Sequence, residues 1–227
     1  YLAALAIYSV SLFFSLVCNF MVLRWLGNPD VGLLLGTYVG YLLIGVAMLA
    51  VGMVASFLTG NLTVSFVLAA LFNVPLALAS MADVVLPAER ARDVQQWSAG
   101  DHLLRSFGRG ILSFSGLVYF LAIAAAMLYL AMVLIGRRHW VRGRDGGFQA
   151  AHFALRVACL VAVAFGLTYF FRHHDVRLDV TSERLSSLAP ETTALLDKFE
   201  PGRPVQIEAF ISPTVPEGYV QTRLNLI

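Results

Sequence analysis

Charged side chains are scarce in this sequence, and several long stretches contain none. Charged residues make up 13% of the chain, against about 25% in soluble domains. No Asp, Glu, Lys or Arg occurs in residues 1–23, 31–82 or 110–136. Because about 20 apolar helical residues cross the hydrocarbon core of a bilayer, these runs predict membrane-spanning helices and exclude a soluble fold.

Lysine and cysteine are also rare, which limits the chemistry available. The only lysine is Lys198, and no glycine-rich phosphate loop precedes it, so the sequence has no nucleotide-binding motif of the Walker type. The net charge of +2 is too small to indicate nucleic-acid binding. Cys18 and Cys159 both lie in apolar runs, where we expect them to pack as small hydrophobes rather than pair. No Ser/His/Asp constellation is indicated, and we expect no enzyme.

The apolar runs predict an α-helical integral membrane protein with five spans. The expected spans are residues 1–23, 31–58, 62–82, 111–135 and 148–171. The uncharged run 31–82 is divided by Thr59, Gly60 and Asn61. We expect Pro75 to kink the third span, and Arg156 to extend its guanidinium toward the membrane surface.

The region after residue 171 has the composition of a water-soluble domain. Pro190 predicts the start of a helix, residues 205–211 predict a buried strand, and residues 219–227 predict a second helix. This order predicts the start of an α/β domain over residues 172–227. The adjacent His173, His174 and Asp175 could be read as metal ligands, but neighbouring residues point apart, and a polar collar at a helix end is the better interpretation. We expect the chain to be the middle part of a longer polypeptide.

Small residues recur at one spacing in the second expected span. Gly32, Gly36 and Gly40 lie four residues apart, which places them on one helix face and allows close approach of another backbone. Packing within one protomer is the favoured interpretation, with a dimer seam as the alternative.

The polar segment between the third and fourth spans, residues 83–110, combines charged and apolar side chains. We expect Asp101 to cap a short helix that carries Leu103, Leu104 and Phe107 on one side. Such a helix would lie at the membrane interface with His102 as an interfacial polar residue, although a solvated loop is an equal alternative.

The densest basic cluster lies between the last two spans and predicts the orientation. It consists of Arg137, Arg138, Arg142 and Arg144. The excess of positive charge in cytoplasmic loops makes this cluster cytoplasmic. With five spans, the C-terminal region then lies on the outer side.

Several short motifs in the first part of the chain resemble the ABC-2 type permeases of the gliding-motility GldF group. They are Leu26-Gly27-Asn28-Pro29-Asp30-Val31-Gly32, Gly36-Thr37-Tyr38-Val39-Gly40, Ala55-Ser56-Phe57-Leu58-Thr59, Asp101-His102-Leu103 with Phe107 and Gly110, and Tyr119-Phe120. This resemblance covers residues 1–138. The later motifs Arg177-Leu178-Asp179-Val180-Thr181, Ser187-Leu188, Pro190-Glu191-Thr192 and residues 205–212 resemble the partner protein GldG, although Ala189 stands where a capping Ser is expected.

The resemblance implies a fusion of two proteins. Residues 1–136 would be helices three to six of the permease, with the outer loop motif Gly27, Asn28, Pro29 and Asp30 and an outer re-entrant segment at residues 83–110. Residues 137–147 would be a cytoplasmic linker, residues 148–171 an additional span, and residues 172–227 the start of a periplasmic GldG-like domain.

The partners that the resemblance implies define the expected function. A cytoplasmic ABC ATPase, in two copies, would hold ATP and Mg²⁺, whereas this chain would bind no cofactor or metal. A second permease protomer, a periplasmic partner and the bilayer of the bacterial inner membrane complete the expected surroundings. The expected function is the permease subunit of an ATP-driven exporter. The alternative is a non-transporting machine that transmits ATP-driven motion. A secondary transporter would need intramembrane charges, which are nearly absent here.

Overall fold

The computed structural model describes residues 1–84, 86, 87, 90, 91, 94, 95, 97–137, 144–182, 184 and 187–198. The chain divides into two units, Tyr1–Ser187 and Leu188–Ile227. The first unit is almost entirely helical and carries the residues of interest.

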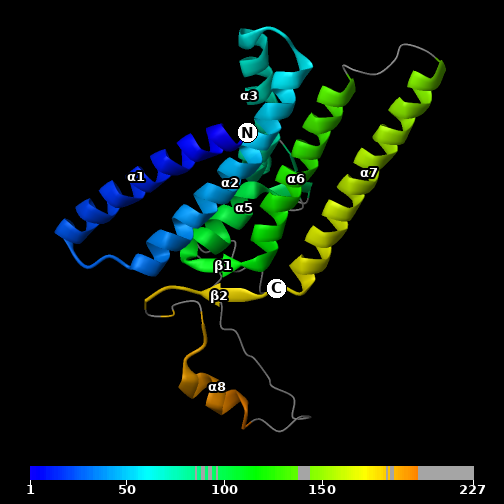
Figure 1. Cartoon of the computed structure of the whole chain (residues 1–227). Coiled ribbons are helices and arrows are strands. Elements are labelled where there is room, and N and C mark those ends of the chain that lie inside the picture. Colours follow the sequence, from blue (N-terminus) through cyan, green and yellow to red (C-terminus); the bar gives the residue numbers. More distant parts are fainter. Residues whose placement is uncertain are drawn as a thin grey trace. The chain divides into compact units, whose positions relative to one another are not determined.

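Helices make up most of the first unit (Figure 1). The long helices are α1 (Leu2–Leu26), α2 (Val31–Leu58), α3 (Leu62–Leu78), α6 (Phe114–Arg137) and α7 (Arg144–His173). Between α3 and α6 lie the short turns η1 (Ala79–Val84), α5 (Ala99–Asp101), η2 (His102–Ser106) and η3 (Phe107–Arg109). The described part of this unit also contains two short strands, β1 (Ile111–Ser113) and β2 (Arg177–Asp179).

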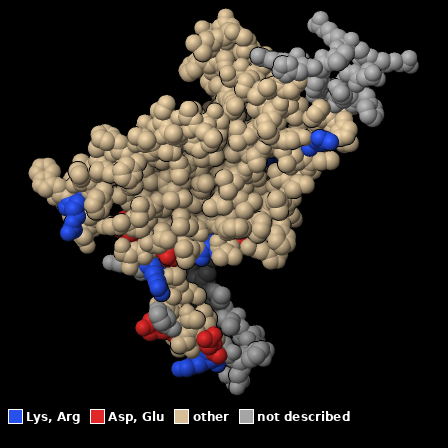
Figure 2. All heavy atoms as spheres, in the orientation of Figure 1, with Lys and Arg blue, Asp and Glu red and all other residues tan. Residues whose placement is uncertain are grey.

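Among the described residues, five helices are long and apolar enough to cross a membrane, as predicted, by length and composition. The candidate spans are Leu2–Leu26, Val31–Leu58, Leu62–Ala82, Phe114–Gly136 and Ala151–His173. Their surfaces are rich in exposed large apolar side chains such as Phe13, Phe66 and Val163, and the bundle surface in Figure 2 is almost free of charge. A surface of this kind belongs in lipid rather than in water.

Helix α2 is the centre of the bundle. It packs against α1, α3 and α6 and against the turns that precede α6. The buried core joins Leu43 and Ala47 of α2 to Ala99, Phe107 and Phe120. Seven further residues of α2 with small or branched side chains are buried, including Gly36 and Gly40, and their small size lets neighbouring backbones approach closely.

Two residues of the segment between α3 and α6 are buried within the first unit. Phe107 is 1% exposed, and His102 is also buried. The predicted cap is wrong, because Ser98, not Asp101, caps the short helix by accepting a hydrogen bond from the Asp101 N–H at 3.0 Å. Ser98-Ala99-Gly100-Asp101 has the spacing of a capping box, a signal that points to Ser98.

The helix boundaries also differ from the expected ones at several points. Helix α1 continues through Arg24 and Trp25. Helix α3 continues three residues beyond Pro75 before the chain tightens into η1. Helix α7 begins at Arg144, so residues 144–147, expected in a flexible linker, are helical.

The strands β1 and β2 were not anticipated. They pair antiparallel, with Ile111 opposite Asp179, Leu112 opposite Leu178 and Ser113 opposite Arg177. Three residues give too little alternation to predict a strand, and the pairing joins segments that are more than 60 positions apart in sequence.

In the second unit, the structure describes one helix, α8 (Pro190–Leu196). It begins at Pro190, as the sequence predicted. Its N-cap residue is Ala189, and the Thr193 hydroxyl donates to the Ala189 carbonyl at 3.3 Å. Phe199, the predicted strand at residues 205–211 and the predicted helix at residues 219–227 lie outside the described residues.

Candidate functional site

A network of hydrogen bonds forms a junction at the end of the bundle where α2 and α6 begin (Figure 1). Residues 175–182, here called the strap, run across this end after α7. Besides the β1–β2 ladder, the Phe114 N–H donates to the Val176 carbonyl at 3.0 Å, and the Val180 N–H donates to the Gly110 carbonyl at 3.0 Å. Main-chain bonds therefore hold the strap along its length.

Asp175 fixes the strap to the start of α6. Its carboxylate accepts the Ser115 N–H at 2.9 Å and the Ser113 hydroxyl at 3.1 and 3.2 Å. Its side chain is only 8% exposed, and Arg177 Nε donates to it at 2.9 Å. Burial acts to raise the pKa of Asp175, but the hydrogen bonds from Ser115, Arg177 and Ser113 outweigh it, so the pKa lies below its usual value. The group is a charged carboxylate that also caps α6.

Asp30 fixes the other end of the strap to the start of α2. Its carboxylate caps α2 by accepting the Leu33 N–H at 3.0 Å. The same carboxylate accepts the Ser182 N–H at 3.2 Å and the Ser182 hydroxyl at 3.1 Å. The hydrogen bond from the Leu33 N–H, with those from Ser182, holds the pKa of Asp30 below its usual value. One carboxylate thus ties a helix start to a segment 152 positions away.

Gly32, Gly36 and Gly40 of α2 face backbone and side chains of the same chain. A methyl group at Gly32 would meet the Val180 carbonyl of the strap. One at Gly36 would lie 3.0 Å from the Gly110 Cα, and one at Gly40 would lie 2.7 Å from the Phe107 Cβ. The strip therefore receives the strap and the turn before α6, rather than a neighbouring helix. Gly110 itself adopts φ 71°, a conformation that favours glycine.

His102 lies among aromatic rings just below this junction. Its ring centroid is 4.7 Å from that of Tyr119 and 6.3 Å from that of Phe120. Burial lowers the pKa of His102, which Asp101 and Asp175 act to raise and Arg172 to lower. The imidazole is therefore neutral at pH 7, and its flat ring completes the packing between the turn and α6.

Trp97 joins the segment before α6 to α7. Its ring stacks on Phe165 and Tyr169, with centroid distances of 5.3 and 6.3 Å, and the Arg172 guanidinium lies 4.6 Å from its centroid. The Tyr119 hydroxyl donates to the Trp97 carbonyl at 3.0 Å. An aromatic and cationic contact thus supplements the strap near the end of α7.

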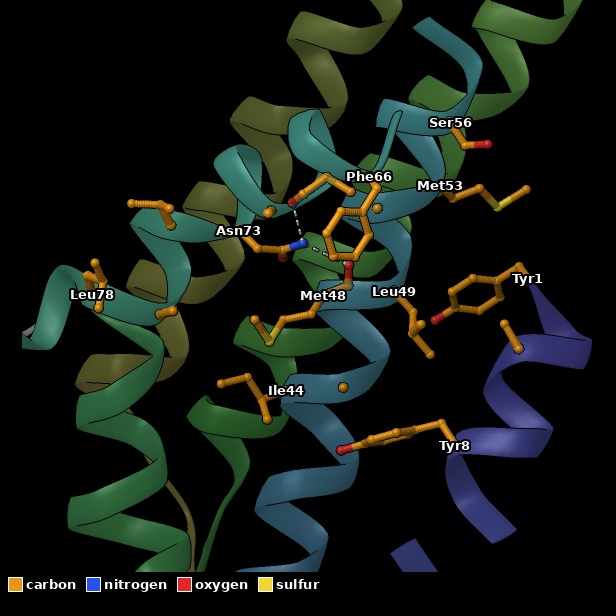
Figure 3. Close-up of a pocket in the computed structure, with 17 residues that line it drawn as sticks. Tyr1, Tyr8, Ile44, Met48, Leu49, Met53, Ser56, Phe66, Asn73 and Leu78 are labelled. Atoms are coloured by element: carbon orange, nitrogen blue, oxygen red, sulfur yellow. Dashed lines mark hydrogen bonds between the residues drawn. The ribbon is translucent and has the colours of Figure 1, made fainter. Parts of the chain in front are cut away.

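A groove of about 890 Å³ lies between α1, α2 and α3 (Figure 3). The side chains that surround it are mostly apolar. Those labelled in Figure 3 are Tyr1 and Tyr8 from α1, Ile44, Met48, Leu49, Met53 and Ser56 from α2, and Phe66, Asn73 and Leu78 from α3. The groove lies within the candidate spans and is a hydrocarbon-lined surface.

The polar groups at this groove are mostly directed into the helices. The Tyr1 hydroxyl donates to the Val46 carbonyl at 2.9 Å, and the Tyr8 hydroxyl donates to the Tyr41 carbonyl at 2.7 Å. The Asn73 amide donates to the Ala69 carbonyl at 2.9 Å, while its buried Oδ1 accepts no hydrogen bond in the structure. The two tyrosine bonds join Tyr1 and α1 to α2, whereas the Asn73–Ala69 bond lies within α3. Together they leave the groove wall apolar.

The remaining residues singled out from the sequence are distributed along the chain. Gly27 ends α1, and Asn28 accepts a hydrogen bond from Arg24 at 2.9 Å, so the loop motif closes onto α1 and, through Asp30, onto α2. Arg137 is the last residue of α6, and Arg144 is the first residue of α7. Arg138 and Arg142 lie outside the described residues.

His173, His174 and Asp175 do not converge. The two imidazoles each bond to a carbonyl of their own helix, of Tyr169 at 3.0 Å and of Phe170 at 3.3 Å, whereas Asp175 turns to α6. Within the described ranges, no group of three or more His, Cys, Asp or Glu residues is placed to hold a metal ion. The polar groups of the junction instead form hydrogen bonds that hold the strap to the starts of α2 and α6.

The sequence singled out Asp30 in a loop motif and Asp175 in a polar collar, but it did not predict the bonds that make the junction. Ser113, Ser115 and Ser182 were missed, because no local pattern distinguishes them from other serines in the sequence. Comparison of the chain with protein-family models, with curated proteins and with solved structures finds no match.

Proposed function

We propose that this chain is the membrane subunit of an ABC-2 type, exporter-like ATP-driven complex in the bacterial inner membrane, with its C-terminal region in the periplasm. The observation that carries the proposal is the segment between α3 and α6, which folds back into the bundle. Its Phe107 packs against Gly40 of α2 and Phe120 of α6. The family that the sequence motifs resemble is expected to have such a segment before its last helix.

The energy for such a complex would come from a separate subunit. The sequence has a single lysine and no phosphate-binding loop, so a cytoplasmic ABC ATPase, in two copies, would hold ATP and Mg²⁺. Under the proposed orientation, the Thr59–Asn61 turn and the basic linker between α6 and α7 face the cytoplasm. A second copy of this chain would supply the other half of the membrane part.

A second candidate function is the transmission of ATP-driven motion to a periplasmic partner without transport. The observation that favours it is the strap, which ties the root of the C-terminal region to the starts of α2 and α6. The groove between α1, α2 and α3 supports the same interpretation, because its apolar wall offers little to a polar substrate. Both candidates need the same ATPase, and they differ in whether a substrate crosses.

Affinity purification of the full-length protein from its native membrane tests the proposal. We expect the protein to co-purify with an ATPase in a ratio of two ATPase copies to two membrane subunits. The purified membrane subunit alone should bind no labelled ATP, with the recovered complex as the positive control. ATP hydrolysis by the isolated chain, or a native complex that contains no ATPase, would contradict the proposal.

A further inference from the structure

The strap contacts the starts of two helices that are not adjacent in sequence. Asp175 at its beginning accepts the Ser115 N–H of α6, and Ser182 at its end donates to Asp30 at the start of α2. Between these points, β2 pairs with β1 immediately before α6. A displacement of α2 or α6 along its axis would therefore pull directly on main-chain hydrogen bonds of the strap.

Contact with α2 is closest at Gly32. A methyl group there would overlap the Val180 carbonyl, with the Thr181 Cα only 3.1 Å away. Both neighbours are backbone atoms, which cannot rotate aside as a flexible side chain can. Thr181 is itself buried, 5% exposed, against Gly110. The strap therefore lies directly on the first turn of α2, with no side chain between them.

Helix α7, from which the strap emerges, is held by packing against α6 and by ring contacts. It packs along α6, but Leu155, Val163, Phe165 and Phe170 are among its exposed apolar side chains. Its described contacts beyond α6 are mainly ring contacts with Trp97. Ring stacking permits sliding more readily than directional hydrogen bonds of fixed length do.

We infer that the strap is a transmission element, which makes the root of the C-terminal region move with the starts of α2 and α6 rather than with α7. Movement in the membrane bundle reaches the region after Ser187 through the bonds of Asp30, Asp175 and the β1–β2 ladder. This role rests on the proposed ATP-driven function, whereas the contact between the strap and α2 is a property of the chain alone. Gly32 permits this contact, because it has no side chain to keep the strap away from the helix.

The test uses full-length protein in nanodiscs with Cys18 and Cys159 replaced by Ala. Spin labels at exposed positions 187 and 35 report the distance between α2 and Ser187, which lies five residues after the strap. Labels at positions 187 and 163 report the distance between Ser187 and α7. Gly32→Ala inserts the methyl group that the strap excludes. Gly166→Ala is the matched control, because it makes the same change in a helix where nothing lies within 4 Å.

In the parent protein and in Gly166→Ala we expect a narrow 187–35 distance distribution. In Gly32→Ala the distribution should broaden and shift to longer distances. Ser182→Ala, which removes only the hydroxyl donor, should give a smaller change and serves if Gly32→Ala does not fold. An unchanged 187–35 distance distribution in the folded variants would contradict the contact between the strap and α2.

The transmission itself is tested in the complex with its ATPase. Trapping with ATP and vanadate should shift the 187–163 distance in the parent protein and in Gly166→Ala, and this shift should be lost in Gly32→Ala. A shift that persists in Gly32→Ala would overturn transmission through the strap. Failure to find an ATPase would instead contradict the proposed function. It would not affect the contact between the strap and α2, because the 187–35 distances are measured without nucleotide.

Discussion

The carboxylate of Asp175 and the backbone N–H of Ser115, 60 positions apart in sequence, form a 2.9 Å hydrogen bond at the start of α6. This hydrogen bond has two effects. It satisfies an N–H that a helix start leaves without a partner, and it fixes the point where the chain leaves the last span. The fold of the first unit therefore depends on a few directional bonds at one end of an otherwise apolar bundle.

Replacing Asp175 tests how much this bond contributes. Asp175→Ala leaves the Ser115 N–H without its acceptor. The Ser113 hydroxyl loses Asp175 but keeps its hydrogen bond with Ser115 Oγ, and it still accepts the Gly116 N–H. We expect a loss of about 1–3 kcal/mol in the free energy of unfolding. Thermal unfolding of detergent-solubilised protein measures the change. Arg177→Ala is the control, because its 66% exposed side chain contributes less than about 1 kcal/mol as a surface ion pair. Equal effects of the two variants would contradict the capping role.

Substitution of Gly40 tests the close packing of α2 against the turn before α6. In Gly40→Ala the new methyl group would lie 2.7 Å from both the Phe107 Cβ and the Leu103 Cδ1. Overpacking of this kind costs about 1–3 kcal/mol, which a lower unfolding temperature would reveal. Gly136→Ala in α6, where nothing lies within 4 Å, should be neutral or slightly stabilising. A normal unfolding temperature for Gly40→Ala would refute the packing.

A larger side chain on the same glycine face of α2 should destabilise the protein more than Gly40→Ala does. Gly36→Leu must displace Gly110 and the Phe107 carbonyl, which lie 3.0 and 3.2 Å from the position of a Cβ. Since both are backbone atoms, we expect poor assembly or loss of stable protein from the membrane. Quantitative immunoblotting of membranes, with Gly136→Ala as reference, measures the loss. Normal expression and normal unfolding of Gly36→Leu would show that this face is open.

The pH dependence of stability tests the burial of His102. Burial lowers the pKa of His102 below its usual value near 6.5, so below about pH 6.5 the unfolded chain binds a proton that the folded chain does not. Stability is then full above that pH and declines as the pH falls toward the folded-state pKa. The unfolding temperature should fall less between about pH 7.5 and pH 5.5 in His102→Gln than in the parent protein. Asp30 and Asp175, whose pKa values are also lowered, stay charged in this range. Parallel pH profiles would contradict the prediction.

Single cysteines test the proposed orientation. In a background without Cys18 and Cys159, a cysteine at position 142 should react with an impermeant maleimide only from the cytoplasmic side. A cysteine at position 193 should react only from outside. These results follow from five spans and from the excess of arginine at residues 137–144. Labelling of both positions from the same side of intact cells would contradict the arrangement.

The sequence by itself determined the number of spans and most of their positions. Uncharged runs of about 20 residues have one stable environment, a bilayer, and the hydrogen bonds of a helix are local. The boundaries of α2 at Val31 and Leu58 could be predicted for this reason. The start of α8 at Pro190 could be predicted because proline suits the first turn of a helix. The glycine spacing of α2 likewise predicted close packing on one face, but not what would occupy that face.

Only the tertiary structure decided the junction. The bonds from Ser115 to Asp175 and from Ser182 to Asp30 span 60 and 152 positions, and no local pattern marks such pairs. The burial of Phe107 has the same origin, because Phe107 fits against Gly40 of α2 and beside the ring of Phe120 of α6. Apolar periodicity tells which face avoids water, whereas the identity of the contacting partner depends on how distant segments meet in three dimensions.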